Sequence, residues 1–75
     1  MIKVSYDKSV DAAYIFFQDL GRKISKNYLC DPKEVNGMIN LDFDDKGMLV
    51  GLEVIGASKK LPKEILDNAD IISKS

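Results

Sequence analysis

The sequence predicts an α+β fold, a single small domain in which an antiparallel β meander of about five strands carries one C-terminal helix packed on the sheet. Up to about residue 55, apolar and polar residues alternate as in strands with one buried face, and glycine or acidic turn residues separate the runs. After Ser58 the apolar spacing changes to three and four residues, which is typical of a helix. The domain is expected to span 1–75, with the sheet over about 2–55 and the helix over about 62–72.

The first strand is predicted over about 2–6, where apolar and polar residues alternate. Turn-forming residues at 7–11 separate it from an apolar run at 12–17, whose aromatic and β-branched residues favour a second strand over a helix. Gly21 can adopt a positive φ at little steric cost, so it is expected to close a tight hairpin within 19–22. The third strand should therefore follow directly beside the second.

The third predicted strand, over 23–31, alternates less regularly and carries more charge, as expected of an edge strand that resists aggregation. Pro32 should end it, because proline has no amide hydrogen to donate to a sheet. The strand also holds Cys30, the single cysteine of the chain. The sequence contains no histidine that could activate the thiol, so Cys30 is interpreted as a structural residue.

The segment from Gly37 to Ser58 has the clearest pattern, two alternating strands around the turn Asp44-Asp45-Lys46-Gly47. Acidic residues favour a type I turn, and a glycine at its end suits a short hairpin connection. Gly51, inside the second of these strands, indicates a bend, a bulge or the close approach of another group. One face of the hairpin should be buried, with its register set by these residues: Ile39, Leu41, Phe43, Val50, Leu52 and Val54.

The helix is predicted from the positions of Leu61, Ile65, Ala69 and Ile72, which are four, four and three residues apart. Pro62 suits the first turn of a helix, where a missing amide hydrogen costs nothing. The helix is expected to pack on one face of the sheet.

The composition argues against several classes of function. The net charge is −1, with 11 basic and 12 acidic residues, whereas a non-specific polyphosphate site needs a strongly positive face. The absence of histidine removes the side chain most often used for proton transfer and a common metal ligand. We therefore expect no enzyme, no catalytic residue, no cofactor and no metal site. The lone cysteine and the absence of a long apolar segment favour a cytoplasmic protein without membrane contact.

One motif resembles a calcium loop, Asp42-x-Asp44-x-Lys46-Gly47-x5-Glu53. Lys46 places a positive charge where an oxygen ligand belongs, Val50 cannot bind or hold a water, and both flanks alternate like strands rather than helices. Asp42 and Glu53 occupy polar positions of adjacent strands, and paired carboxylates can do acid–base work, but a solvated hairpin face is the favoured interpretation.

Basic residues form two groups, Arg22-Lys23-x-x-Lys26 and Lys59-Lys60-x-x-Lys63, with Tyr28 near the first. Lysines with aromatics on an exposed sheet can bind single-stranded nucleic acid. Solubilising charge on an edge strand and at a helix start explains them as well and is preferred.

Two patterns in fixed order resemble a known family: Tyr6-Asp7-x3-Asp11-x2-Tyr14-Ile15, then Gly37-x3-Leu41-Asp42-x-Asp44-x2-Gly47-x3-Gly51-x-Glu53-x-Ile55-x-Ala57-Ser58. Over about residues 3–58 the chain resembles the small prokaryotic domain-of-unknown-function family numbered 2283. The resemblance implies a compact, mostly antiparallel β domain with no established activity and no catalytic residues to assign. Members of that family are sometimes suspected of serving as partners of toxin-like neighbours, which hints at protein binding.

The leading hypothesis is a small non-enzymatic protein that acts through protein contacts and self-associates. One short helix cannot cover both faces of the sheet, so Tyr14, Phe16 and Leu29 are expected to form an exposed apolar patch. A regulatory module that binds nucleic acid or a toxin-like partner is the alternative. A second alternative is a weak activity that uses a divalent metal held by Asp42, Asp44 and Glu53.

Overall fold

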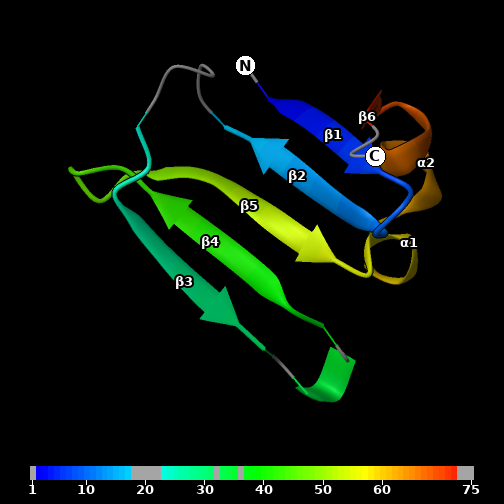
Figure 1. Ribbon diagram of the computed structural model, residues 1–75, viewed down its shortest axis with the longest axis horizontal. Helices are drawn as coiled ribbons and strands as arrows, with labels where there is room; N and C mark the ends of the chain where they lie inside the picture. Colours follow the sequence, from blue (N-terminus) through cyan, green and yellow to red (C-terminus); the bar gives the residue numbers. More distant parts are fainter. Residues whose placement is uncertain (1, 18–22, 32, 36, 73–75) are drawn as a thin grey trace.

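The structure, a computed structural model, describes residues 2–17, 23–31, 33–35 and 37–72. Within these residues the strands are β1 (Lys3–Asp7), β2 (Ala12–Phe16), β3 (Lys26–Cys30), β4 (Ile39–Phe43), β5 (Leu49–Ile55) and β6 (Asp70–Ile72). They form one six-stranded sheet in the order β3-β4-β5-β2-β1-β6 (Figure 1). The helical segments are η1 (Lys33–Val35), α1 (Ala57–Lys60) and α2 (Lys63–Asp67).

The strand order confirms a mostly antiparallel sheet with a helical C-terminal part, but the predicted five-strand meander is wrong. β2 does not pair with β3; it lies between β1 and β5, and β3 pairs with β4 at the edge (Figure 1). The reason is burial. Within β3 every residue before Cys30 is exposed, whereas β5 contains buried residues and needs a strand on each side. The predicted tight turn at 19–22, like Pro32, lies outside the described residues.

The β4–β5 hairpin is confirmed. Ile39 pairs with Val54 and Leu41 with Leu52, so their side chains share one face as predicted. Gly47 has a φ of 80°, and Oδ1 of Asp44 accepts the backbone amides of Lys46 and Met48, both at 2.9 Å. A register shift between Asp42 and Phe43 lets β5 carry one extra residue.

The C-terminal region differs from the single helix predicted over 62–72. Within that range α2 occupies only Lys63–Asp67, and the chain then returns as β6, which pairs in parallel with β1; the other helix, α1, lies before Pro62. Pro62 has an extended ψ of 142° and therefore separates the two helices. The Asn68 side chain donates to the Glu64 carbonyl at 2.8 Å, and the β-branched residues after it suit a strand.

Cross-strand pairing defines the two faces of the sheet, because paired residues point to the same side. The apolar face is formed by Val4, Tyr6, Ala13, Ile15, Tyr28, Cys30, Ile39, Leu41, Phe43, Leu52 and Val54, and it also carries Lys26, which pairs with Phe43. The polar face is formed by Lys3, Ser5, Asp7, Ala12, Tyr14, Phe16, Asn27, Leu29, Asn40, Asp42, Gly51, Glu53 and Ile55.

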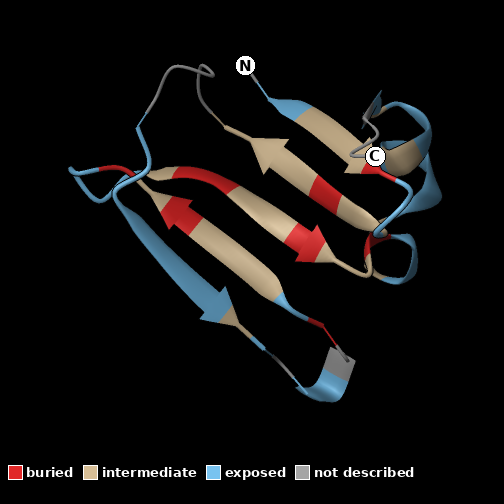
Figure 2. Cartoon of the chain, in the orientation of Figure 1, coloured by how far each residue is buried: buried red, intermediate tan, exposed pale blue. Residues whose placement is uncertain are grey.

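The core is small and lies where the helices meet the apolar face. Its buried members are Ala13, Val54 and Ala57, and the partly buried residues packed against them are Tyr6, Leu52, Leu61 and Leu66. Both helices lie at one end of the sheet, beside β1 and the carboxyl end of β5 and away from β3 (Figure 1). Figure 2 shows buried residues mainly on the central strands and an almost entirely exposed β3. Much of the apolar face therefore lies away from the helices.

Candidate functional site

The polar face carries a hydrogen-bonded array that joins four strands. The Tyr14 hydroxyl on β2 donates to Oδ2 of Asp42 on β4 at 2.5 Å. Nδ2 of Asn27 on β3 donates to Oδ1 of the same carboxylate at 2.6 Å. One row further along, Nδ2 of Asn40 donates to Oε1 of Glu53 at 3.1 Å. The buried Asp42 thus has a donor for each of its oxygens.

Gly51 makes this array possible. It lies on β5, between the strands of Tyr14 and Asp42, and a Cβ added there would come within 2.8 Å of the Tyr14 hydroxyl and 2.6 Å of the Ile15 carbonyl oxygen. The tyrosine ring can cross β5 only because this position has no side chain. Of the bend, bulge or close approach that Gly51 indicated, the structure shows the close approach, although the sequence did not show which group approaches.

The surroundings of Tyr14 stabilise the protonated form of its hydroxyl. Burial raises the pKa of its hydroxyl, the hydrogen bond to Asp42 raises this pKa further, and the negative charges of Asp42 and Glu53 act in the same direction. A tyrosine with a raised pKa donates a hydrogen bond and is a poor base or nucleophile near neutral pH. The arrangement is suited to positioning groups on the polar face rather than to acid–base chemistry.

A second network centres on Asp11, in the turn between β1 and β2. Its Oδ1 accepts the Tyr6 hydroxyl at 2.7 Å and the Ser58 amide at 3.0 Å, and its Oδ2 accepts the Ser58 hydroxyl at 2.7 Å. The Asp11 carbonyl accepts the amides of Gly56 and Ala57 at 2.8 and 3.0 Å. These bonds attach the start of α1 to the first turn of the sheet. The two patterns that resemble the known family, one beginning at Tyr6 and the other ending at Ser58, therefore meet here.

Asp11 also has a lowered pKa and an unusual backbone conformation. The hydrogen bond from Tyr6 is the main cause that lowers the pKa of its carboxyl group, followed by the bond from Ser58. The φ of Asp11 is 52°, a left-handed value that aspartate tolerates better than most residues. In the same turn, Oδ1 of Asp7 accepts the Ser9 amide at 3.0 Å.

The carboxylates considered for a metal are not brought together. Asp42 and Glu53 share the polar face, as predicted, but Asp44 lies in the β4–β5 turn, where its Oδ1 caps backbone amides. Among the described residues, no three Asp, Glu or Cys side chains are placed so that they could hold one metal ion. The flanks of the calcium-like motif are strands, as the alternation indicated.

The two basic groups lie apart. Lys23 and Lys26 are exposed at the β3 edge, and Arg22 lies outside the described residues. Lys59 and Lys63 are exposed on the helices at the opposite end of the sheet (Figure 1). Lys60 is half-buried, and its Nζ donates to the Ile55 carbonyl at 2.6 Å. The described lysines therefore do not form one continuous basic surface.

The predicted apolar patch is only partly correct. Tyr14 and Phe16 pack against each other with ring centroids 4.4 Å apart, and Leu29 is 56% exposed. All three lie on the polar face, but Asn40 and Glu53 stand between Leu29 and Tyr14 in the same cross-strand row. The sequence could not show that Leu29 lies apart from Tyr14 and Phe16, because it does not reveal that β4 and β5 stand between β3 and β2.

The continuous apolar surface lies instead on the opposite face. Tyr28, Leu41, Leu52, Ile15 and Val4 are consecutive cross-strand neighbours from β3 to β1. Tyr28 is 55% exposed and packs edge-on against Phe43 at 5.8 Å, and the other four are half-buried. Cys30, a free and half-buried thiol, lies at the end of the neighbouring row on this face.

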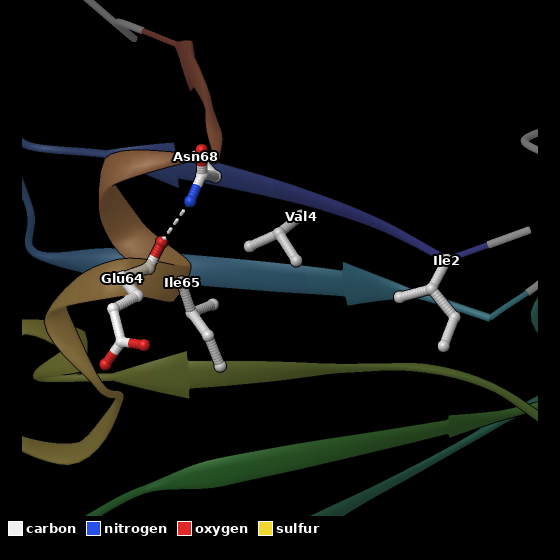
Figure 3. Close-up of a pocket in the computed structure, with 5 residues that line it drawn as sticks. All are labelled: Ile2, Val4, Glu64, Ile65 and Asn68. Carbon is white, nitrogen blue, oxygen red and sulfur yellow. Dashed lines mark hydrogen bonds between the residues drawn. The ribbon is translucent and has the colours of Figure 1, made fainter.

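The row ends at a cleft beside α2. Its lining residues come from the start of the chain, β1, α2 and the residue that ends α2: Ile2, Val4, Glu64, Ile65 and Asn68 (Figure 3). Ile2 is 65% exposed and Ile65 is 37% exposed. The cleft extends the apolar surface onto the helix.

The structure defines a small α+β domain with a mixed sheet, one polar face with hydrogen-bonded carboxylates and one apolar face that the helices cover at one end. Residues 3–58 match the model of the family described as "Protein of unknown function (DUF2283)", and the chain belongs to this family. The comparison with curated proteins and the comparison with solved structures find no match. Within the described residues, no helix is long and apolar enough to cross a membrane.

Proposed function

We propose that this protein is a non-enzymatic protein-interaction module that self-associates through the apolar face of its sheet. The observation that carries the proposal is the apolar row of Tyr28, Leu41, Leu52, Ile15 and Val4, which crosses five strands without a charged side chain. A contiguous apolar surface on a small protein is the feature that marks interaction sites.

The small core supports the same proposal. Among the described residues, no large side chain is fully buried, and the buried apolar residues are alanines and valines.

A second copy suits this surface better than a charged partner. The row carries no ionisable group besides the Tyr28 phenol, and Lys26, which lies on the same face, is exposed on the edge strand, so two copies can meet along the row without burying an unpaired charge. A two-fold contact would place the same row on both sides of the interface, which is the commonest arrangement in homo-oligomers. The net charge of −1 adds little repulsion between copies.

We also propose a cytoplasmic location. The support is the single free cysteine, since stable domains of this size in oxidising compartments are commonly held by disulfides.

Two neighbouring residues of β3 provide a matched test. Tyr28 and Leu29 are 55% and 56% exposed and lie on opposite faces of the same edge strand. We expect Tyr28→Asp to shift the protein toward monomer and Leu29→Asp to leave the association unchanged, because only the former places a charge in the apolar row. Sedimentation equilibrium from low to high micromolar concentration measures the mass of each variant.

Circular dichroism should show that both variants keep the fold, since both positions are mostly exposed. A strict monomer for the unmodified protein at high micromolar concentration would remove the proposal. Equal effects of the two substitutions would show that association does not use the apolar face.

A further inference from the structure

The polar face contains a hollow that the self-association proposal does not use. It has a volume of about 340 Å³ and lies over β1 and β2 beside the Tyr14 array. Its lining residues come from β1, β2 and β5, from the turn between β1 and β2, and from the segment before β3. Ligand sites in proteins begin at roughly 300 Å³, so this hollow has room for a small molecule.

The shape of the hollow follows from the sequence. Ser5 and Ala12 put small side chains on adjacent strands, which leaves a low floor. Tyr14 and Phe16 follow Ala12 on the same face of β2 and form an aromatic wall, with their rings tilted 49° to each other. Tyr14 is held in place from the other side by Asp42 through its hydroxyl. The aromatic wall is therefore ordered before any ligand arrives.

Apolar side chains complete the rim. Val10 from the first turn and Ile24 from the segment before β3 are 62% and 48% exposed, and both line the hollow. Each loses water contact if a ligand with an apolar body occupies the space between them, which favours binding.

The charge of the hollow is negative. Glu53 pairs with Tyr14 across the strands, is half-buried and lines the hollow, and its Oε1 is held by Asn40. Asp7 also lines it, and the Asp42 carboxylate stands behind the Tyr14 hydroxyl. Among the residues of the described strands on this face, the basic one is Lys3, which pairs with Phe16 and does not line the hollow.

From this combination we infer that the hollow over β1 and β2 binds a small organic ammonium ion with an apolar body. The Glu53 carboxylate compensates the positive charge, and the faces of Tyr14 and Phe16 attract a cation through their quadrupoles. An anion would meet Glu53 and Asp7, and a neutral ligand would leave the half-buried carboxylate without compensation.

Phenethylammonium is a suitable probe, with 2-phenylethanol as a neutral molecule of nearly the same shape. In a titration followed by two-dimensional amide NMR, the ammonium ion should shift the signals of Ser5, Tyr14 and Glu53. The alcohol should bind roughly fivefold more weakly, as should the ammonium ion to Glu53→Gln, because each change removes one partner of a partly exposed ion pair.

Glu64→Gln is the matched control, since Glu64 lines the cleft on the opposite face. It should bind the ammonium ion as the unmodified protein does. Glutamine can still accept the hydrogen bond from Asn40, so the spectrum of Glu53→Gln should remain that of a folded protein.

Three results would overturn the inference: no saturable shift at tens of millimolar ammonium ion, equal affinity for the alcohol, or unchanged affinity in Glu53→Gln. None of them bears on self-association, because that proposal depends on the other face of the sheet.

Discussion

Asp11 joins two parts of the protein that are distant in the sequence. Its carboxylate bonds to Ser58, 47 residues further along, and to Tyr6 on the neighbouring strand. Because its carbonyl also accepts two amides at the start of α1, one residue attaches α1 to the first turn of the sheet. An aspartate can do this at a positive φ that most other residues avoid.

This arrangement predicts a pH dependence of stability. The pKa of Asp11 is lowered in the folded protein, so its charged form stabilises the fold above the unfolded pKa of about 3.9, and that contribution is lost as the pH falls through the lower folded value. Asp11→Asn tolerates the same backbone and removes the charge. We expect it to lower the free energy of unfolding by up to about 1 kcal/mol at pH 7, because solvent screens a carboxylate this near the surface.

Urea denaturation at several pH values measures this difference, which should shrink below about pH 4. The exposed Asp45 provides a control, and Asp45→Asn should change the stability little at any pH. A difference for Asp11→Asn that stays constant down to pH 2 would contradict the assigned role.

At the scale of elements, β5 is the strand on which the sheet depends. It pairs with β4 on one side and β2 on the other, and Gly51 opposes both Asp42 and Phe16. The glycine lets Tyr14 reach Asp42 across the strand, so the array of the polar face and the pairing of the central strands rest on the same position.

Gly51→Ala is therefore expected to destabilise the protein by about 2 kcal/mol, because its Cβ would lie 2.6 Å from the Ile15 carbonyl oxygen, a backbone atom that cannot move alone. Gly47→Asn is the comparison. That glycine has a φ of 80° with nothing within 4 Å of an added Cβ, and asparagine tolerates this conformation. Chemical denaturation should show a clearly smaller loss for Gly47→Asn, and equal losses would refute the close-contact argument.

Some elements of the fold depend only on residues that are close together in the sequence. The β4–β5 hairpin, the edge position of β3 and the exposed charge on β3 were predictable, because alternation and turn residues specify them within a few positions. The C-terminal helix was predicted too long, since apolar residues spaced by three and four at 61–72 fit a helix although Pro62 and Asn68 interrupt it. β6 was missed, because a three-residue strand leaves almost no periodic signal.

At the scale of the whole molecule, self-association and folding should be linked. If the apolar face is covered by a second copy, the midpoint of thermal unfolding must rise with protein concentration, by roughly 5–10 °C for a hundredfold increase in a dimer of this size. Scanning calorimetry over that range measures the change. Tyr28→Asp should show a midpoint that depends little on concentration, and a concentration-independent midpoint of the unmodified protein would contradict the link.

The candidate sites were less predictable than the fold. Glu53, Asp42 and Tyr14 were each noticed in the sequence, but their arrangement depends on residues 28 positions apart meeting across Gly51. The exposed apolar patch was predicted from Tyr14, Phe16 and Leu29, whereas the continuous apolar row lies on the opposite face, because the pairing of β2 with β5 decides which side chains are neighbours.

By itself, the sequence determined the family, the alternating strands, the hairpin around Gly47 and the hydrophobic set of its buried face, since these depend on neighbours in the chain. Only the tertiary structure decided that β2 lies beside β5, that β6 joins in parallel, and that Asp11 meets Ser58. The physical reason is that the pairing of strands distant in the sequence depends on which arrangement buries the most apolar surface over the whole sheet. A short stretch of sequence carries no information about that choice.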